Sequence, residues 1–156
     1  MSLPAQQSNL KEKLCNILTG FGFQEILTYS LVSLEKLQKL SPKLELKLPP
    51  LKVANPMTKE QEYLRTSLRA GLLTMLAHNQ KFEQAGIRLF EIGKVFLPQH
   101  PSVIATLSET KGKQSQEEID LPQEKEMLCA VLSGAMAELS WRADKEPLDF
   151  FDAKGI

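Results

Sequence analysis

The sequence predicts an α+β fold in which a largely antiparallel β-sheet is flanked by helices. Helical and strand patterns follow one another in an irregular order rather than as repeated βαβ units. Residues 43–48 alternate strictly between charged residues and leucines, as expected of a strand with one exposed face. Residues 87–97 are apolar on both faces, which is typical of a central strand covered on both sides.

A first helix is predicted over residues 9–20. Asn9 with Glu12 three positions later has the pattern of an N-cap and capping box, and Gly20 or Gly22 is expected to end the helix. Apolar residues recur at helical spacing along one face. They are Leu10, Leu14, Ile17, Leu18 and Phe21.

The chain from residue 23 to residue 54 is predicted to be mainly extended. Residues 23–32 are rich in aromatic and β-branched side chains and predict a strand, and residues 33–40 predict a short helix capped by Ser33. The two prolines after the strand 43–48 mark it as an edge or a bulge. Residues 51–54 are expected to return to extended structure.

A second helix is predicted after Ser67, which can cap it. Its apolar stripe consists of Leu68, Leu72, Leu73 and Leu76, with Asn79 in line. Beyond the strand 87–97, residues 98–125 read as a long surface excursion, and residues 127–133 as a short strand ended by Gly134.

Length and composition favour one domain. A chain of 156 residues suits a single domain, expected over residues 4–156 and truncated at its carboxyl end, while residues 1–3 are expected to be an expression remnant. Nineteen basic residues balance nineteen acidic ones, so no global charge favours nucleic acid or an anionic membrane. No apolar run approaches a membrane span and no signal peptide is evident. We expect a soluble, cytoplasmic protein without a membrane partner.

The usual catalytic and metal-binding motifs are absent from the sequence. Gly20 and Gly22 are followed by Glu25 where a dinucleotide fingerprint needs glycine, and no phosphate-binding Gly-rich loop occurs. His78 and His100 have no Cys or His at zinc-ligand spacing. Cys15 and Cys129 fit small buried thiols better than a disulfide or a nucleophile. We therefore expect no metal, no cofactor and no catalytic residue in this chain.

Glu91 is a charged residue within the otherwise largely apolar predicted strand 87–97. A carboxylate within an apolar strand is costly to bury unless it is paired. It could serve as a general acid or metal ligand, but a structural pair, with Arg65 or Arg88, is the favoured interpretation. Arg65, Arg69, Lys81 and Arg88 could also form a basic surface, although no aromatic residues are interleaved for base stacking.

Several ordered blocks of the sequence resemble one family, the beta subunit of bacterial phenylalanyl-tRNA synthetase. The match includes Glu25, Asn55 with Pro56, Arg65 with Ser67, and Glu91 with Gly93. These residues lie in the blocks 22–30, 55–58, 64–68, 71–73, 89–96, 121–124 and 147–155, with Asn79.

The resemblance implies a class II aminoacyl-tRNA synthetase-like fold that is catalytically degenerate. It also implies an assembly of two alpha and two beta subunits, in which the alpha subunit charges tRNA(Phe) with ATP and Mg²⁺. Leu97 stands where active class II enzymes place an arginine on the ATP phosphate, and Pro98 and Gln99 follow. The chain alone is therefore expected to be inactive and to serve as a structural, subunit-binding module.

Two other functions stay open. One is a free-standing synthetase paralogue acting as a regulatory subunit, and the other is a small enzyme that uses Glu91. For the leading hypothesis, the first helix is the expected assembly surface. We expect Ile17, Leu18 and Phe21 to enter the core and Leu10 and Leu14 to face a partner, so that the isolated chain self-associates.

Overall fold

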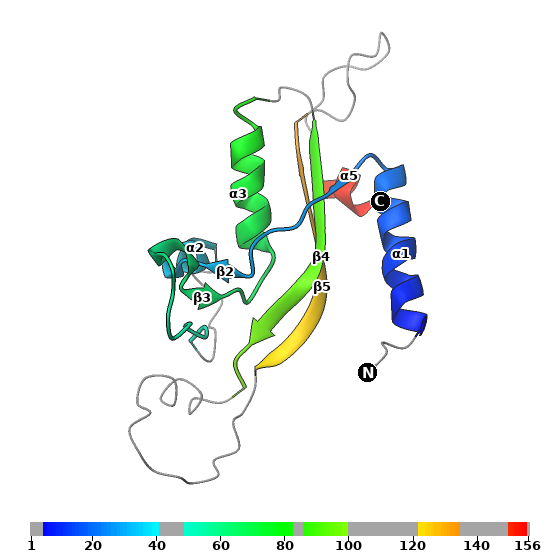
Figure 1. The fold of residues 1–156 in the computed structure, drawn as a ribbon. Coiled ribbons are helices and arrows are strands. Elements are labelled where there is room, and N and C mark those ends of the chain that lie inside the picture. The colour runs from blue at the N-terminus through cyan, green and yellow to red at the C-terminus, as the bar shows by residue number, and fades with distance from the viewer. Residues whose placement is uncertain (1–4, 41–48, 83–85, 100–121, 135–149, 156) are drawn as a thin grey trace, which may run out of the picture. The chain divides into compact units, whose positions relative to one another are not determined.

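The computed structural model describes residues 5–40, 49–82, 86–99, 122–134 and 150–155. It is a mixed α+β arrangement of short and long elements (Figure 1). In chain order they are α1 (Ala5–Gly20), β1 (Gln24–Glu25), β2 (Leu31–Val32), α2 (Leu34–Leu40), the 3₁₀ helix η1 (Lys59–Gln61), β3 (Tyr63–Leu64), α3 (Arg69–Asn79), β4 (Ile87–Leu97), β5 (Gln123–Ser133) and α5 (Phe150–Lys154).

The chain forms two compact units, and each is assembled from separate stretches of sequence. Unit 1 comprises residues 1–28, 71–92 and 128–156, and unit 2 comprises residues 29–70 and 93–127. The long strands β4 and β5 and the helix α3 contribute residues to both units.

The sheets are small and only partly antiparallel. One has the strand order β1-β4-β5, which confirms β4 as a central strand, and the other pairs β2 with β3. In Figure 1 β5 runs beside β4 in the opposite direction. β1 pairs parallel to β4, with Gln24 opposite Leu89 and Glu25 opposite Phe90, whereas β2 and β3 are antiparallel. The expectation of a largely antiparallel sheet is therefore corrected for β1, which reaches the sheet directly from a helix.

Helix α1 ends in a glycine-dependent turn that aims the chain at the sheet. Gly22 has φ of 79°, a left-handed conformation that costs glycine little. Its N–H donates to Thr19 O at 2.9 Å, and the N–H of Phe23 donates to Leu18 O at 3.0 Å. These two hydrogen bonds define a Schellman motif, in which the residues Leu18 and Phe23 also make the accompanying apolar contact. The predicted end of the helix at Gly20 or Gly22 is confirmed, since Gly20 is the last helical residue and Gly22 forms the turn.

The core of unit 1 lies between α1 and the sheet. Leu18, Phe23, Phe90 and Ile92 are its buried residues, and Leu14, Cys15 and Leu132 pack against them half-buried. Ile17 and Phe21 were expected in this core, but they are 51% and 48% exposed. The prediction was wrong because the core side of α1 is centred on Leu14, Cys15 and Leu18, one row around the helix from the expected side.

Unit 2 has a smaller core around the short helix α2. Val32, Leu37 and Ala70 are buried there, with Leu40 and Tyr63 packed against them. Ser33 accepts the N–H of Lys36 at 3.3 Å, which supports its predicted role as the cap of α2. Residues 51–54 are tied to β3 through Val53 N–H to Glu62 O and Leu64 N–H to Leu51 O, both 2.8 Å.

Several predicted boundaries are corrected. Helix α1 begins at Ala5, so Asn9 lies inside it rather than at its cap. The predicted strand 23–32 is interrupted, with only residues 24–25 and 31–32 in strand conformation. β5 begins at Gln123 instead of residue 127, and it ends before Gly134 as predicted. The predicted strand 43–48 and most of the excursion 98–125 lie outside the described residues.

Candidate functional site

The buried carboxylate predicted to need a partner receives two hydrogen bonds from Thr28. Glu91 is 1% exposed and lies on β4. Its Oε2 accepts the hydroxyl of Thr28 at 2.7 Å, and its Oε1 accepts the backbone N–H of Thr28 at 3.3 Å. Residue 28 is thus held at two atoms by one side chain 63 positions away.

Gly71, near the start of α3, lies directly against the same threonine. A Cβ placed on Gly71 would lie 2.2 Å from Thr28 Oγ1 and 2.7 Å from Thr28 Cβ. The glycine is therefore required for close approach of the helix backbone to the Thr28 side chain. Nothing in the sequence pattern identified Thr28 as part of this cluster, because its partners are distant in sequence.

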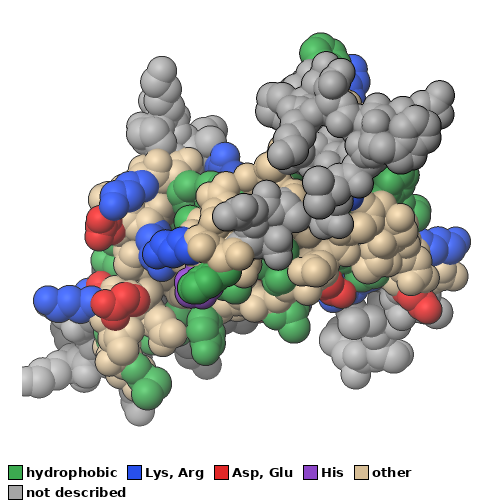
Figure 2. Space-filling view, turned by 90° about the horizontal axis from the view of Figure 1, so that it is seen from above, with side chains coloured by type: hydrophobic (Ala, Val, Ile, Leu, Met, Phe, Trp, Pro, Cys, Tyr) green, Lys and Arg blue, Asp and Glu red, His purple; other side chains and the backbone are tan. Residues whose placement is uncertain are grey.

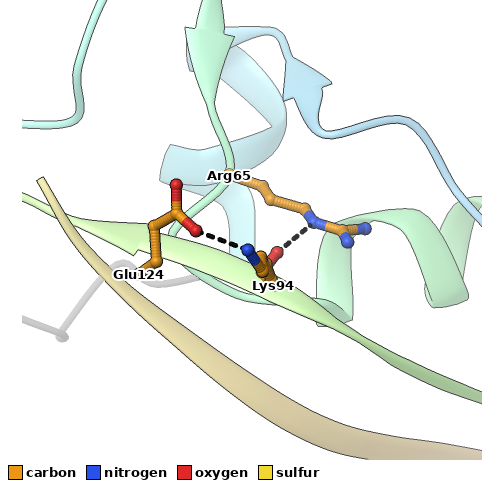
Figure 3. A network of polar contacts seen from close by, with 3 residues as sticks. All are labelled: Arg65, Lys94 and Glu124. Carbon is orange, nitrogen blue, oxygen red and sulfur yellow. Dashed lines mark hydrogen bonds and ion pairs between the residues drawn. The ribbon is translucent and has the colours of Figure 1, made fainter. Parts of the chain in front are cut away.

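The second buried ionic residue, Arg65, connects three segments of unit 2. It is 5% exposed, and its Nε donates to Lys94 O at 2.8 Å (Figure 3). Its backbone N–H donates to Ser30 O, and its carbonyl accepts the N–H of Phe96, both at 2.9 Å. Arg65 therefore belongs to the interior of the unit and is no part of a basic surface.

Lys94 places its own side chain on the surface. Its Nζ lies 2.7 Å from Glu124 Oε2 on β5, as Figure 3 shows, and both side chains are largely exposed. The Glu124 carboxylate raises the pKa of Lys94 above its ordinary value. On the described part of the face seen in Figure 2, Lys and Arg side chains are interspersed with Asp and Glu. This mixture gives no support to a continuous basic patch for nucleic acid.

The remaining residues of the family blocks lie at turns and strand ends. The Ser67 hydroxyl accepts the N–H of Arg69, the first residue of α3, at 3.2 Å, as a helix-capping side chain would. Glu25 is exposed on β1, Asn55 is exposed and Pro56 half-buried in an irregular segment, and Gly93 is half-buried within β4.

The Cys15 thiol lies beside Glu25. Its Sγ is 3.7 Å from Glu25 Oε2 and acts as the donor. Burial raises the pKa of the Cys15 thiol, and the negative charge of Glu25 raises it further. Cys15 and Cys129 are both half-buried and carry no disulfide. These surroundings make Cys15 a poor nucleophile, because the thiolate is the reactive form.

One face of α1 is left exposed. Leu10, Ile17 and Phe21 are 59%, 51% and 48% exposed. On a helix of 3.6 residues per turn they fall within about 40° of one another, so they form one stripe. Leu14 was expected to share this surface with Leu10, but it packs half-buried against the core. We call Leu10, Ile17 and Phe21 the α1 stripe.

The described residues form neither a metal-binding cluster nor a membrane-spanning helix. Within residues 5–40, 49–82, 86–99, 122–134 and 150–155, no three His, Cys, Asp or Glu side chains are grouped so as to hold a metal ion. In the same ranges no helix is both long and apolar enough to cross a membrane.

The family model that matches this sequence and two of its curated relatives belong to one family. Residues 2–156 match the family model of the phenylalanyl tRNA synthetase beta chain CLM domain. The chain is 42% identical over 147 residues to the phenylalanine–tRNA ligase beta subunit of Dehalococcoides mccartyi strain CBDB1, covering 94% of this chain and 16% of the relative. For the beta subunit of Halalkalibacterium halodurans the identity is 37%, with coverages of 94% and 16%. The chain thus spans about one sixth of the length of these relatives.

The fold is similar to that of pyrrolysyl-tRNA synthetase. A pyrrolysyl tRNA synthetase of Desulfitobacterium hafniense superposes with a TM-score of 0.55 at 24% identity, covering 84% of this chain and 39% of the other. A second structure of that organism's pyrrolysyl-tRNA synthetase gives a TM-score of 0.54 at the same identity, covering 85% of this chain and 40% of the other. At this identity the likeness concerns the fold alone.

Proposed function

Because the chain belongs to the phenylalanyl-tRNA synthetase beta-chain family, we propose that it is a non-catalytic module that binds the alpha subunit of phenylalanine–tRNA ligase. In this proposal it supports ATP-dependent charging of tRNA(Phe) by the alpha subunit, in a cytoplasmic assembly of two alpha and two beta subunits. The α1 stripe is the observation that carries the proposal. It is an apolar helix face that is about half exposed in the described part of the chain.

The stripe is large enough to contribute to a stable subunit contact. Full burial of a large aliphatic or aromatic side chain contributes roughly 1.5–3 kcal/mol. These three residues are already about half buried, so burying the remainder supplies about 2–5 kcal/mol, while association costs an estimated 4–15 kcal/mol. The stripe needs a partner that adds apolar area of its own. An amphipathic helix of the alpha subunit has the right shape for this role.

The end of β4 supports a non-catalytic role. Leu97 and Pro98 are half-buried and Gln99 is exposed, at the place where an active class II enzyme has a phosphate-binding arginine. These side chains offer no positive charge for an ATP phosphate, so they do not fit that ligand. We therefore assign ATP and Mg²⁺ to the alpha subunit. Phenylalanine-dependent pyrophosphate exchange by this chain alone, above a protein-free blank, would contradict the assignment.

The subunit-binding proposal is tested by titrating the purified alpha subunit with the chain in a calorimeter. Ile17→Lys should weaken binding at least tenfold, because it places a charge in the middle of the stripe. Leu73→Lys is the matched control, since Leu73 is also exposed, at 40%, but lies on α3. Equal affinity of the Ile17→Lys chain and the wild type would refute the α1 stripe as the binding surface.

Co-purification separates this proposal from the regulatory-paralogue alternative. A tagged chain that recovers the alpha subunit from lysate supports the ligase module. Recovery of a different synthetase or enzyme would support the paralogue.

A further inference from the structure

Just beyond the end of β1, the side chain of Glu91 accepts a backbone hydrogen bond in place of a main-chain carbonyl. The parallel pairing of β1 with β4 covers Gln24 and Glu25, and the N–H of Ile26 extends it to Phe90 O at 2.8 Å. The next inward-facing N–H belongs to Thr28, and it donates to the side chain of Glu91 at 3.3 Å. A carboxylate therefore serves as the acceptor where the ladder ends.

The same carboxylate restricts the Thr28 side chain. Each of its oxygens accepts a hydrogen bond from Thr28, and the hydroxyl contact of 2.7 Å fixes the rotamer of Thr28. Gly71 closes the space on another side, since even a methyl group there would overlap Thr28. The segment from Ile26 to Thr28 is thereby held at three points, namely two backbone N–H groups and one hydroxyl.

Leu27 is the residue between these anchors, and it points away from the unit. It is 83% exposed although both of its neighbours are held. A single exposed leucine is common and needs no explanation by itself. Here, however, its backbone is fixed by a buried carboxylate, and α1, whose stripe is exposed, leads directly into β1. A side chain held in this way loses less conformational freedom on binding than one on a mobile loop.

We propose that Glu91 is a positioning residue for subunit binding, which acts through Thr28 to present Leu27 to the alpha subunit. This inference rests on the proposed function and extends the binding surface from the α1 stripe to the segment after β1. It also gives Glu91 a role that is neither acid–base chemistry nor metal binding.

A double-mutant cycle measured with the alpha subunit tests the inference. Leu27→Ala should weaken binding about tenfold or more, and Thr28→Val, which keeps the shape but removes the hydroxyl donor, about three- to tenfold. In the Leu27→Ala background Thr28→Val should not weaken binding further, because the Leu27 side chain through which Thr28 acts on the partner is absent. Thr28→Ser, which keeps the hydroxyl, should bind as the wild type does.

The outcomes distinguish the inference from the proposed function. If Thr28→Val weakens binding equally in both backgrounds, its effect is general destabilisation and the inference is overturned. If Leu27→Ala binds normally while Ile17→Lys does not, the α1 stripe stands and the inference falls. Failure of the wild-type chain to bind the alpha subunit overturns the proposed function itself, and with it the role of Glu91.

Discussion

Gly71→Ala should destabilise the protein, although alanine is the better helix former. The added Cβ would lie 2.2 Å from Thr28 Oγ1, 2.7 Å from its Cβ and 2.9 Å from its Cγ2. Overpacking of this kind costs about 1–3 kcal/mol. Displacing Thr28 also weakens its hydrogen bond to Glu91, and a buried donor or acceptor left unsatisfied costs about 1–3 kcal/mol. Replacing a helical glycine by alanine returns about 1 kcal/mol.

The net loss expected for Gly71→Ala is therefore about 1–5 kcal/mol in the free energy of unfolding, measured by urea denaturation with an unchanged m-value. Gly20→Ala is the matched control, because Gly20 ends α1 and has nothing within 4 Å of the added Cβ. It should be neutral or slightly stabilising. Gly71→Ala combined with Thr28→Ala should cost less than the sum of the two changes, since the nearest overlapping atom is gone. A Gly71→Ala protein as stable as the wild type would refute the packing described for Thr28.

Three further predictions concern charge, reactivity and association. Arg65→Met should lower the free energy of unfolding by about 1–3 kcal/mol, because Lys94 O loses its buried donor, whereas Lys94→Met should leave the urea midpoint nearly unchanged. Cys15 should react with iodoacetamide more slowly in the folded chain than in urea at pH 8–9, because its raised pKa leaves less thiolate. Glu25→Gln should lower the pKa of Cys15 and speed the reaction. Mass spectrometry follows the alkylation. The isolated chain should self-associate through the α1 stripe in sedimentation experiments. Ile17→Lys should make the chain monomeric without unfolding it, whereas Leu14→Lys should unfold it. A wild-type chain that is monomeric at all concentrations would contradict this prediction.

The elements set by local patterns were predictable from sequence. The largely apolar residues 87–97 predicted a central strand, and the glycines at positions 20 and 22 predicted the end of α1. Both depend on chemistry within a few residues. The helix stripe of residues 68–76 was also correct except for Leu73, which is 40% exposed.

The errors occurred where a distant contact selects between locally similar possibilities. The sequence of α1 offers two adjacent apolar rows, and only the packing of Leu18 and Phe23 on Phe90 determines which row is buried. The composition of residues 23–32 favours an unbroken strand, but the side chain of Glu91 replaces the neighbouring main chain at Thr28. The requirement of Glu91 for a partner was predictable from the cost of burying a charge. The hydrogen bonds from Thr28 were not, since the two residues are 63 positions apart.

The division of the chain into interleaved units has a consequence for biosynthesis. Unit 2 needs residues up to 127, and unit 1 needs residues beyond 128, so neither unit is complete until most of this segment has left the ribosome. Closing such long loops must precede the contacts that stabilise them, which slows folding. Until then the apolar strand residues 87–97 would emerge without their neighbours from β5. Until β5 is made, the unpaired edge and apolar surface of this strand leave the nascent chain prone to aggregation.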